Sequence, residues 1–309
     1  MYDALHRLLL GAFPPATRIV DVRSYRPQYL PYPALVTLDT GNDAQEYCVI
    51  KVAERFETLA QEARALRALG DLGLPVPTVL AGPLLLDDDG HPQPAMVLSE
   101  LHGRPLPWVG VADLAEADLT CQLTQLAVDT LHDLTERVTS HEVATALPRI
   151  TLLSELDTLR GYADAWSDTP LIVEALALLE AILPTISTPL VFSNGDYNPL
   201  NFLHVGGELT GWVDFEHACF EDPYIGFAKF MLWADDDHGW GTGRKAGLVE
   251  RFLYAHNVSR TDFLPRLLLR GLRYLQDQHI TGVQLRAGEH AYVLQLLTEA
   301  VVSLRAETQ

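Results

Sequence analysis

The sequence predicts an α+β fold. A small N-terminal lobe is expected to be an antiparallel sheet, and a larger C-terminal lobe is expected to be mainly helical. Three observations support this division. Strand-like runs separated by turn residues fill the first third of the chain, and leucines recur at helical spacing from residue 113 onward. One hairpin signal, Gly206-Gly207, interrupts the helical region.

The N-terminal lobe begins with a short amphipathic helical pattern in residues 1–16, which ends at a glycine and a proline pair. Extended runs follow, and the turn cluster Thr40–Asp43 joins two of them as a meander. The expected strands lie near residues 18–23, 34–39, 45–53, 79–86 and 95–98.

Lys51 and Glu62 form the first candidate pair of functional side chains. Alternation in the strand near residues 45–53 places Lys51 on one face with Val49, and Glu62 falls on the apolar stripe of the helix expected over residues 55–70. A buried ammonium and a buried carboxylate each need a partner. An ion pair between Lys51 and Glu62 satisfies both, and Glu57 is a weaker alternative partner for the lysine. In the alternative interpretation there is no ion pair: Lys51 lies on an edge strand with its ammonium group in solvent, and Glu62 lies on the shoulder of the helix.

The C-terminal lobe is expected to be helical on both sides of its hairpin. The leucine spacing predicts helices over residues 113–140, 152–165, 171–183, 224–234, 244–256, 260–276 and 288–304. His132 in the first of them is interpreted as a packed structural histidine.

The hairpin carries the strongest candidate site, formed by Asp196, Asn201 and Asp214. With the turn centred on Gly206-Gly207, Asn201 is expected opposite Trp212, so that Asp214 and Asn201 converge at the open end of the hairpin beside the Asp196 loop. Mg²⁺ takes oxygen ligands, and phosphoryl transfer also needs a separate carboxylate to accept a hydroxyl proton. A polar turn without chemistry is the alternative reading of each residue alone.

These motifs resemble the aminoglycoside phosphotransferase and choline kinase-like family. The resemblance rests on the segment Asn194-Gly-Asp-Tyr-Asn-Pro-Leu-Asn201, on Gly211-Trp-Val-Asp-Phe-Glu216 and on Glu221-Asp-Pro223. It implies a two-lobed protein-kinase-like fold, with the lobe boundary between residues 1–102 and residues 103–309. It also implies an ATP-dependent small-molecule kinase with Mg²⁺, which moves the γ-phosphate to a hydroxyl of its acceptor.

The resemblance also implies a role for each candidate residue. Asp196 is expected to be the catalytic base, and Asn201 and Asp214 the Mg²⁺ ligands. Lys51, held by Glu62, is expected to reach the α- and β-phosphates, and the backbone of Ser99, Glu100 and Leu101 to read the adenine. Glu216 is expected near the metal, and Asp235 and Asp236 are acceptor contacts unless they form a solvated charge run.

The sequence departs from the family pattern at three places. Asn194 stands where the family usually has histidine, and Gly226 stands where it usually has aspartate. No glycine-rich loop lies between the first two strands, where the sequence reads Arg26–Pro33 instead. The alternative function is therefore a kinase-fold protein that binds nucleotide or ligand without transfer.

Charge and composition restrict the partners. The chain has 22 basic and 41 acidic side chains, a net charge of −19, which argues against nucleic acid. A field of this sign would attract a cationic acceptor, and solubility alone is the alternative explanation of the charge. It has no apolar run long enough to span a membrane and no signal-peptide pattern. Three scattered cysteines suggest a reducing cytoplasm. The acceptor, the choice between ATP and GTP, and the oligomeric state stay open.

Overall fold

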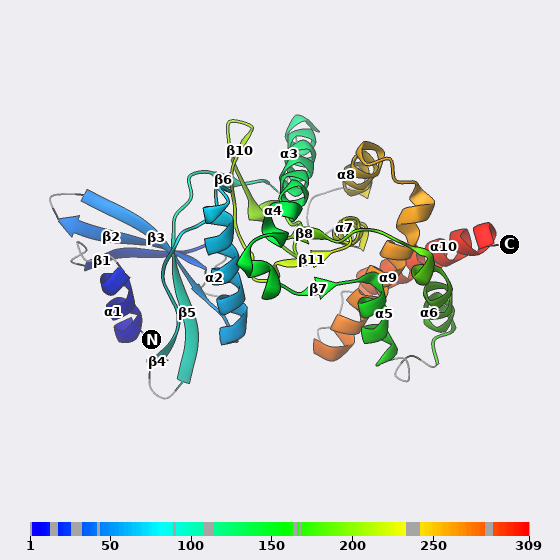
Figure 1. The fold of residues 1–309 in the computed structure, drawn as a ribbon, viewed down its shortest axis with the longest axis horizontal. Coiled ribbons are helices and arrows are strands. Elements are labelled where there is room, and N and C mark those ends of the chain that lie inside the picture. The colour runs from blue at the N-terminus through cyan, green and yellow to red at the C-terminus, as the bar shows by residue number, and fades with distance from the viewer. Residues whose placement is uncertain are drawn as a thin grey trace.

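A computed structural model describes residues 2–12, 18–25, 33–41, 44–88, 91–107, 114–162, 166, 168–232, 242–281 and 287–308. Its N-terminal part is a five-stranded antiparallel sheet in the order β1-β2-β3-β5-β4, with two helices packed on it (Figure 1). The elements are α1 Tyr2–Ala12, β1 Arg18–Ser24, β2 Ala34–Gly41, β3 Ala44–Val52, α2 Phe56–Asp71, β4 Val79–Asp88 and β5 His91–Ser99.

The two faces of this sheet bury different side chains. Cys48 and Ile50 of β3 lie in a small core with Leu9 of α1, whereas Val49 packs on the opposite side against the larger core that includes α2. This is the predicted alternation of β3, and it places Lys51 on the α2 side of the sheet. The strand therefore directs its lysine toward the second part of the molecule.

The second part is mainly helical, and helices surround two small sheets that lie next to the first part (Figure 1). The sheets have the orders β10-β9-β6 and β7-β11-β8. Their strands are β6 Arg104–Pro105, β7 Arg149–Ile150, β8 Val191–Ser193, β9 Phe202–Val205, β10 Glu208–Trp212 and β11 Cys219–Glu221. The α-helices are α3 Leu114–Asp133, α4 Thr135–Thr139, α5 Leu152–Arg160, α6 Pro170–Ile182, α7 Ile225–Leu232, α8 Thr242–Ala255, α9 Arg260–Thr281 and α10 Ala287–Thr308.

The chain passes between the two parts directly after β5. It leaves the first sheet at Ser99, and at Arg104 it joins the hairpin sheet, where Arg104 pairs with His204. The Thr210 hydroxyl of β10 also donates to the carbonyl of His102 at 2.7 Å. A lobe boundary at residues 102 and 103 stays a prediction, because the linker is itself hydrogen-bonded to the hairpin.

Among the helices that the structure describes, none combines the length and the apolar character needed to cross a membrane.

Candidate active site

The β9–β10 hairpin forms where the glycine pair predicts it. Gly206 and Gly207 take φ values of 60° and 92°, which two glycines adopt without a Cβ clash. The predicted register is wrong by one residue: Trp212 lies opposite Phe202 and not opposite Asn201. An irregularity between Leu209 and Gly211 adds one residue to β10, and spacing alone does not reveal such a bulge.

The convergence at the open end of the hairpin survives this shift. Just beyond the paired residues, the Val213 N–H donates to the carbonyl of Asn201 at 2.9 Å, so that Asp214 follows directly. Asn201 belongs to a short 3₁₀ turn, Pro199–Asn201, and is almost completely buried. The backbone thus places Asn201 and Asp214 at the same end of the ribbon.

The Asp196 loop is tightly hydrogen-bonded around its aspartate. Asn194 accepts from the Asp196 N–H at 3.2 Å and donates to the Asp196 carbonyl at 2.8 Å. Asn201 Nδ2 donates to the same carbonyl at 3.0 Å and to Asp196 Oδ2 at 3.2 Å. Gly195 precedes the aspartate with φ 75°, and a Cβ there would lie 2.2 Å from the His217 carbonyl oxygen. The loop is therefore fixed from both sides, while the Asp196 side chain stays one-third exposed.

Lys51 lies at the centre of three carboxylates. Its Nζ is 2.6 Å from Asp214 Oδ1, 2.8 Å from Glu62 Oε2 and 3.2 Å from Glu216 Oε2. Burial alone would lower the pKa of Lys51, but the surrounding carboxylates outweigh burial and raise it above its ordinary value. The predicted Lys51–Glu62 contact is present, and Lys51 is a cation.

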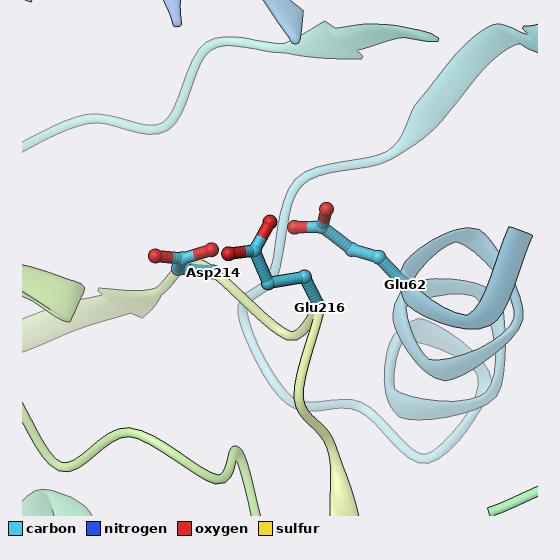
Figure 2. A group of neighbouring side chains, drawn as sticks. All are labelled: Glu62, Asp214 and Glu216. Atoms are coloured by element: carbon cyan, nitrogen blue, oxygen red, sulfur yellow. The ribbon is translucent and has the colours of Figure 1, made fainter. Parts of the chain in front are cut away.

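Glu62, Asp214 and Glu216 point their carboxylates toward one another (Figure 2). One oxygen of each lies within 4.8 Å of the others, so the group offers the hard oxygen ligands that Mg²⁺ requires. Burial raises the pKa of Glu62, and the Lys51 ammonium opposes that rise. Asp214 has a φ of 65°, a conformation that aspartate tolerates better than most residues. The donor set fits a magnesium site shared with a phosphate group.

The three predicted adenine-binding residues lie where β5 leaves the sheet. The Ser99 N–H donates to the Thr78 carbonyl at 2.9 Å, and the Ser99 hydroxyl accepts from the Thr78 N–H. Glu100 is exposed, and Leu101 packs against Gly211 of the hairpin. The Ser99 N–H therefore already has a partner, and the adenine contacts of the backbone of Ser99, Glu100 and Leu101 stay a prediction. Asp235 and Asp236 lie outside the described residues.

Lys229 was not predicted as a site residue, yet it contacts Asp196, the candidate base, directly. Lys229 lies on α7, is buried, and its Nζ contacts Asp196 Oδ1. The signal was present, because Lys229 is the one charged residue in the apolar segment Ile225–Leu232. A lysine inside an apolar helix needs a partner, and its position after Asp222-Pro223 could have suggested the Asp196 loop.

Packing explains the glycine at position 226, where the sequence departs from the family pattern. A Cβ at Gly226 would lie 2.4 Å from two ring carbons of Tyr197, the residue after Asp196. The Tyr197 ring is completely buried, and its hydroxyl is 2.8 Å from His132 Nε2. Burial lowers the pKa of His132 to about 3, so His132 is neutral, as expected for a structural histidine.

We expect Gly226→Ala to destabilise the protein by about 1–3 kcal/mol, since the added methyl group forces the buried Tyr197 ring to move. Gly247→Ala is the matched control: Gly247 also lies in a helix, but nothing is within 4 Å of its Cβ position. The control should gain about 0.5–1 kcal/mol. Urea unfolding of both variants measures the difference, and equal stability would contradict the close packing at Gly226.

Comparison with known proteins gives a family match over most of the chain. A model of the phosphotransferase enzyme family matches residues 35–268. A search of curated proteins gives no significant match.

Solved structures with the same fold cover nearly the whole chain. Aminoglycoside phosphotransferase APH(4)-Ia is 15% identical with a TM-score of 0.69, and the match covers 98% of this chain and 99% of that one. A thermostable mutant of that enzyme, in ternary complex with AMP-PNP and hygromycin B, is 14% identical with a TM-score of 0.69, covering 97% and 98%. Aminoglycoside-3′-phosphotransferase of type VIII is 24% identical with a TM-score of 0.55, covering 87% and 97%. These likenesses confirm the predicted fold.

Proposed function

The chain belongs to the phosphotransferase enzyme family and is an ATP-dependent small-molecule kinase, and we propose that its acceptor is a hydroxyl group on a cationic small molecule such as an aminoglycoside. The observation that carries this proposal is the cluster in which Lys51 meets Glu62, Asp214 and Glu216, at the end of the hairpin that also holds Asn201 against Asp196. It supplies a cation for the phosphates, oxygen ligands for a metal ion and a carboxylate base in one place.

The proposed roles follow from the chemistry of each group. Lys51, held by Glu62, binds phosphate oxygens of ATP. Asp214 and Asn201 would hold Mg²⁺, with Glu216 beside them, and the bound ion would neutralise charge on the phosphates. Asp196 orients the acceptor hydroxyl and takes its proton as the hydroxyl oxygen bonds to the γ-phosphorus. The bond to the β–γ bridging oxygen breaks in the same step, and ADP leaves.

The acceptor class is supported by charge. The net charge of −19 attracts cations, and the cluster around Lys51 adds acidic side chains that are partly exposed, with Asp214 and Glu216 each more than a quarter exposed. A related structure holds hygromycin B, an aminoglycoside, together with a nucleotide analogue. Asp235 and Asp236 stay proposed acceptor contacts on the sequence argument alone.

The proposal is tested by measuring ADP release and phosphorylated product with ATP, Mg²⁺ and two acceptor panels. One panel contains hydroxylated amines, including aminoglycosides, and the other contains neutral sugars of similar size. We expect transfer to members of the cationic panel, decreasing as salt concentration rises because the attraction is screened. Transfer only to neutral acceptors would overturn the acceptor class.

The alternative function, binding without transfer, gives a different result in the same experiment. MgATP would raise the unfolding temperature by binding to the folded state, yet no product would form with either panel. A parallel series with GTP determines the nucleotide preference. The loop of residues that usually covers the phosphates lacks its glycines here, and this departure is the reason for keeping the alternative.

A further inference from the structure

Lys229 is a buried lysine in contact with the proposed base. Its side chain is 9% exposed, whereas that of Asp196 is 34% exposed, so Lys229 approaches the carboxylate from the protein interior. Burial, with Arg270 as a second positive charge, lowers the pKa of Lys229 well below its ordinary value. The Asp196 carboxylate is the opposite charge in direct contact, and it stabilises the ammonium form.

The two oxygens of the Asp196 carboxylate have different partners. Oδ1 contacts Lys229 Nζ, and Oδ2 accepts from Asn201 Nδ2 at 3.2 Å. Each carboxylate oxygen has two lone pairs, so each oxygen keeps capacity for one more hydrogen bond. Two contacts from different elements, α7 and the turn before β9, fix the plane of the carboxylate and leave its exposed edge available to a hydroxyl group.

Stability alone gives a weak reason for this lysine. An ion pair that replaces well-packed apolar side chains is often neutral or unfavourable for folding, because both charges lose water. The rest of α7, residues Ile225–Leu232, is apolar, and an apolar residue would suit position 229 equally well. A general base, by contrast, depends on its orientation, since a misplacement of about 1 Å can cost roughly 10²-fold in rate.

We propose that Lys229 is a positioning residue for phosphoryl transfer, which holds the Asp196 carboxylate in the orientation that receives the acceptor proton. This inference rests on the proposed function. Lys229 acts through Asp196, whereas Lys51 is held by its own ion pairs with Glu62, Asp214 and Glu216. Its loss should therefore reduce the rate of transfer without weakening nucleotide binding.

The test replaces Lys229 by methionine, which keeps the length of the side chain and suits an apolar helix. We expect kcat to fall by about 10²-fold, while KM for ATP and the MgATP dissociation constant stay within about threefold. The unfolding temperature should fall only slightly, because the cost of burying the ammonium group is removed and the Asp196 carboxylate left behind is one-third exposed to water. An unchanged kcat, or a loss of kcat accompanied by a loss of MgATP binding, would overturn the inference.

A double-mutant cycle with Asp196→Asn decides whether Lys229 acts through Asp196. In that background, Lys229→Met should change the residual rate by less than about twofold, since the oriented group is already lost. A further loss of rate as large as the one that Lys229→Met causes in the wild-type background would overturn the inference. Arg160→Met is the matched control, because it removes one cation from an exposed ion pair with Asp157 and Glu180, and its rates should equal those of the wild type.

Turnover by the wild-type enzyme distinguishes a failure of this inference from a failure of the proposed function. Absence of turnover by the wild type with every acceptor would overturn the proposed function and the inference together. Turnover by the wild type with a fully active Lys229→Met variant would overturn the inference alone.

Discussion

Replacing Asp196 by alanine is expected to reduce kcat by about 10²–10⁴-fold, the range that loss of a positioned general base produces. MgATP affinity should stay near the wild-type value, because Lys51 and its three carboxylates do not depend on the Asp196 side chain. Initial rates of product formation give kcat, and isothermal titration with ATP and Mg²⁺ gives the affinity.

The control for this experiment is Asp157→Ala, which removes an exposed carboxylate that pairs with Arg160 on α5. Its kinetic constants should match those of the wild type. Asp196→Ala also removes the carboxylate that contacts the buried Lys229, so a lower unfolding temperature is expected for this variant. Wild-type turnover in Asp196→Ala would exclude this residue as the base.

Short-range patterns predicted two local features of the candidate site. The contact between Lys51 and Glu62 follows from alternation in β3 and from the apolar stripe of α2, elements that are adjacent in the chain. The β9–β10 hairpin follows from its two glycines, because a two-residue turn of this kind needs positive φ values at both positions. Both depend on local geometry, which a sequence specifies directly.

Contacts between distant segments could not be predicted in the same way. Lys51 and Asp214 are 163 residues apart, and their 2.6 Å contact depends on how the first sheet packs on the hairpin. Lys229 and Asp196 are 33 residues apart, and their contact depends on the orientation of α7. The one-residue bulge in β10 shifted the register, because spacing gives the turn but not irregularities in the strands.

The two departures near Asp196 turned out to have structural roles. Asn194 is fully buried, and its side-chain amide holds both the N–H and the carbonyl of Asp196. Gly226 leaves room for the ring of Tyr197. Both residues therefore support the geometry of the loop, and neither removes a group from the cluster around Lys51. Because Asn194 and Gly226 have these structural roles, they no longer argue for a protein without transfer activity.

Replacing Asp214 is expected to affect nucleotide binding, in contrast to replacing Asp196. Asparagine is the suitable substitute, because it tolerates the φ of 65° at this position, where alanine would add backbone strain. Glu62 and Glu216, which lie 2.8 Å and 3.2 Å from Lys51 in the structure, are unchanged in this variant, so the fold should stay intact. Any loss of binding can then be attributed to the metal ligand itself.

We expect Asp214→Asn to raise the dissociation constant of ATP in the presence of Mg²⁺ by about 100-fold, the scale on which changes around a metal site reduce metal affinity. Binding of ATP measured in EDTA should hardly change, since Lys51, the proposed phosphate contact, is still present. Titration calorimetry with and without Mg²⁺ separates the two contributions, and Asp196→Asn serves as the paired variant with intact MgATP binding. Equal losses of MgATP affinity in both variants would contradict separate roles for base and metal ligand, because the ion pair of Lys51 with Asp214 and the contact of Lys229 with Asp196 are distinct in the structure.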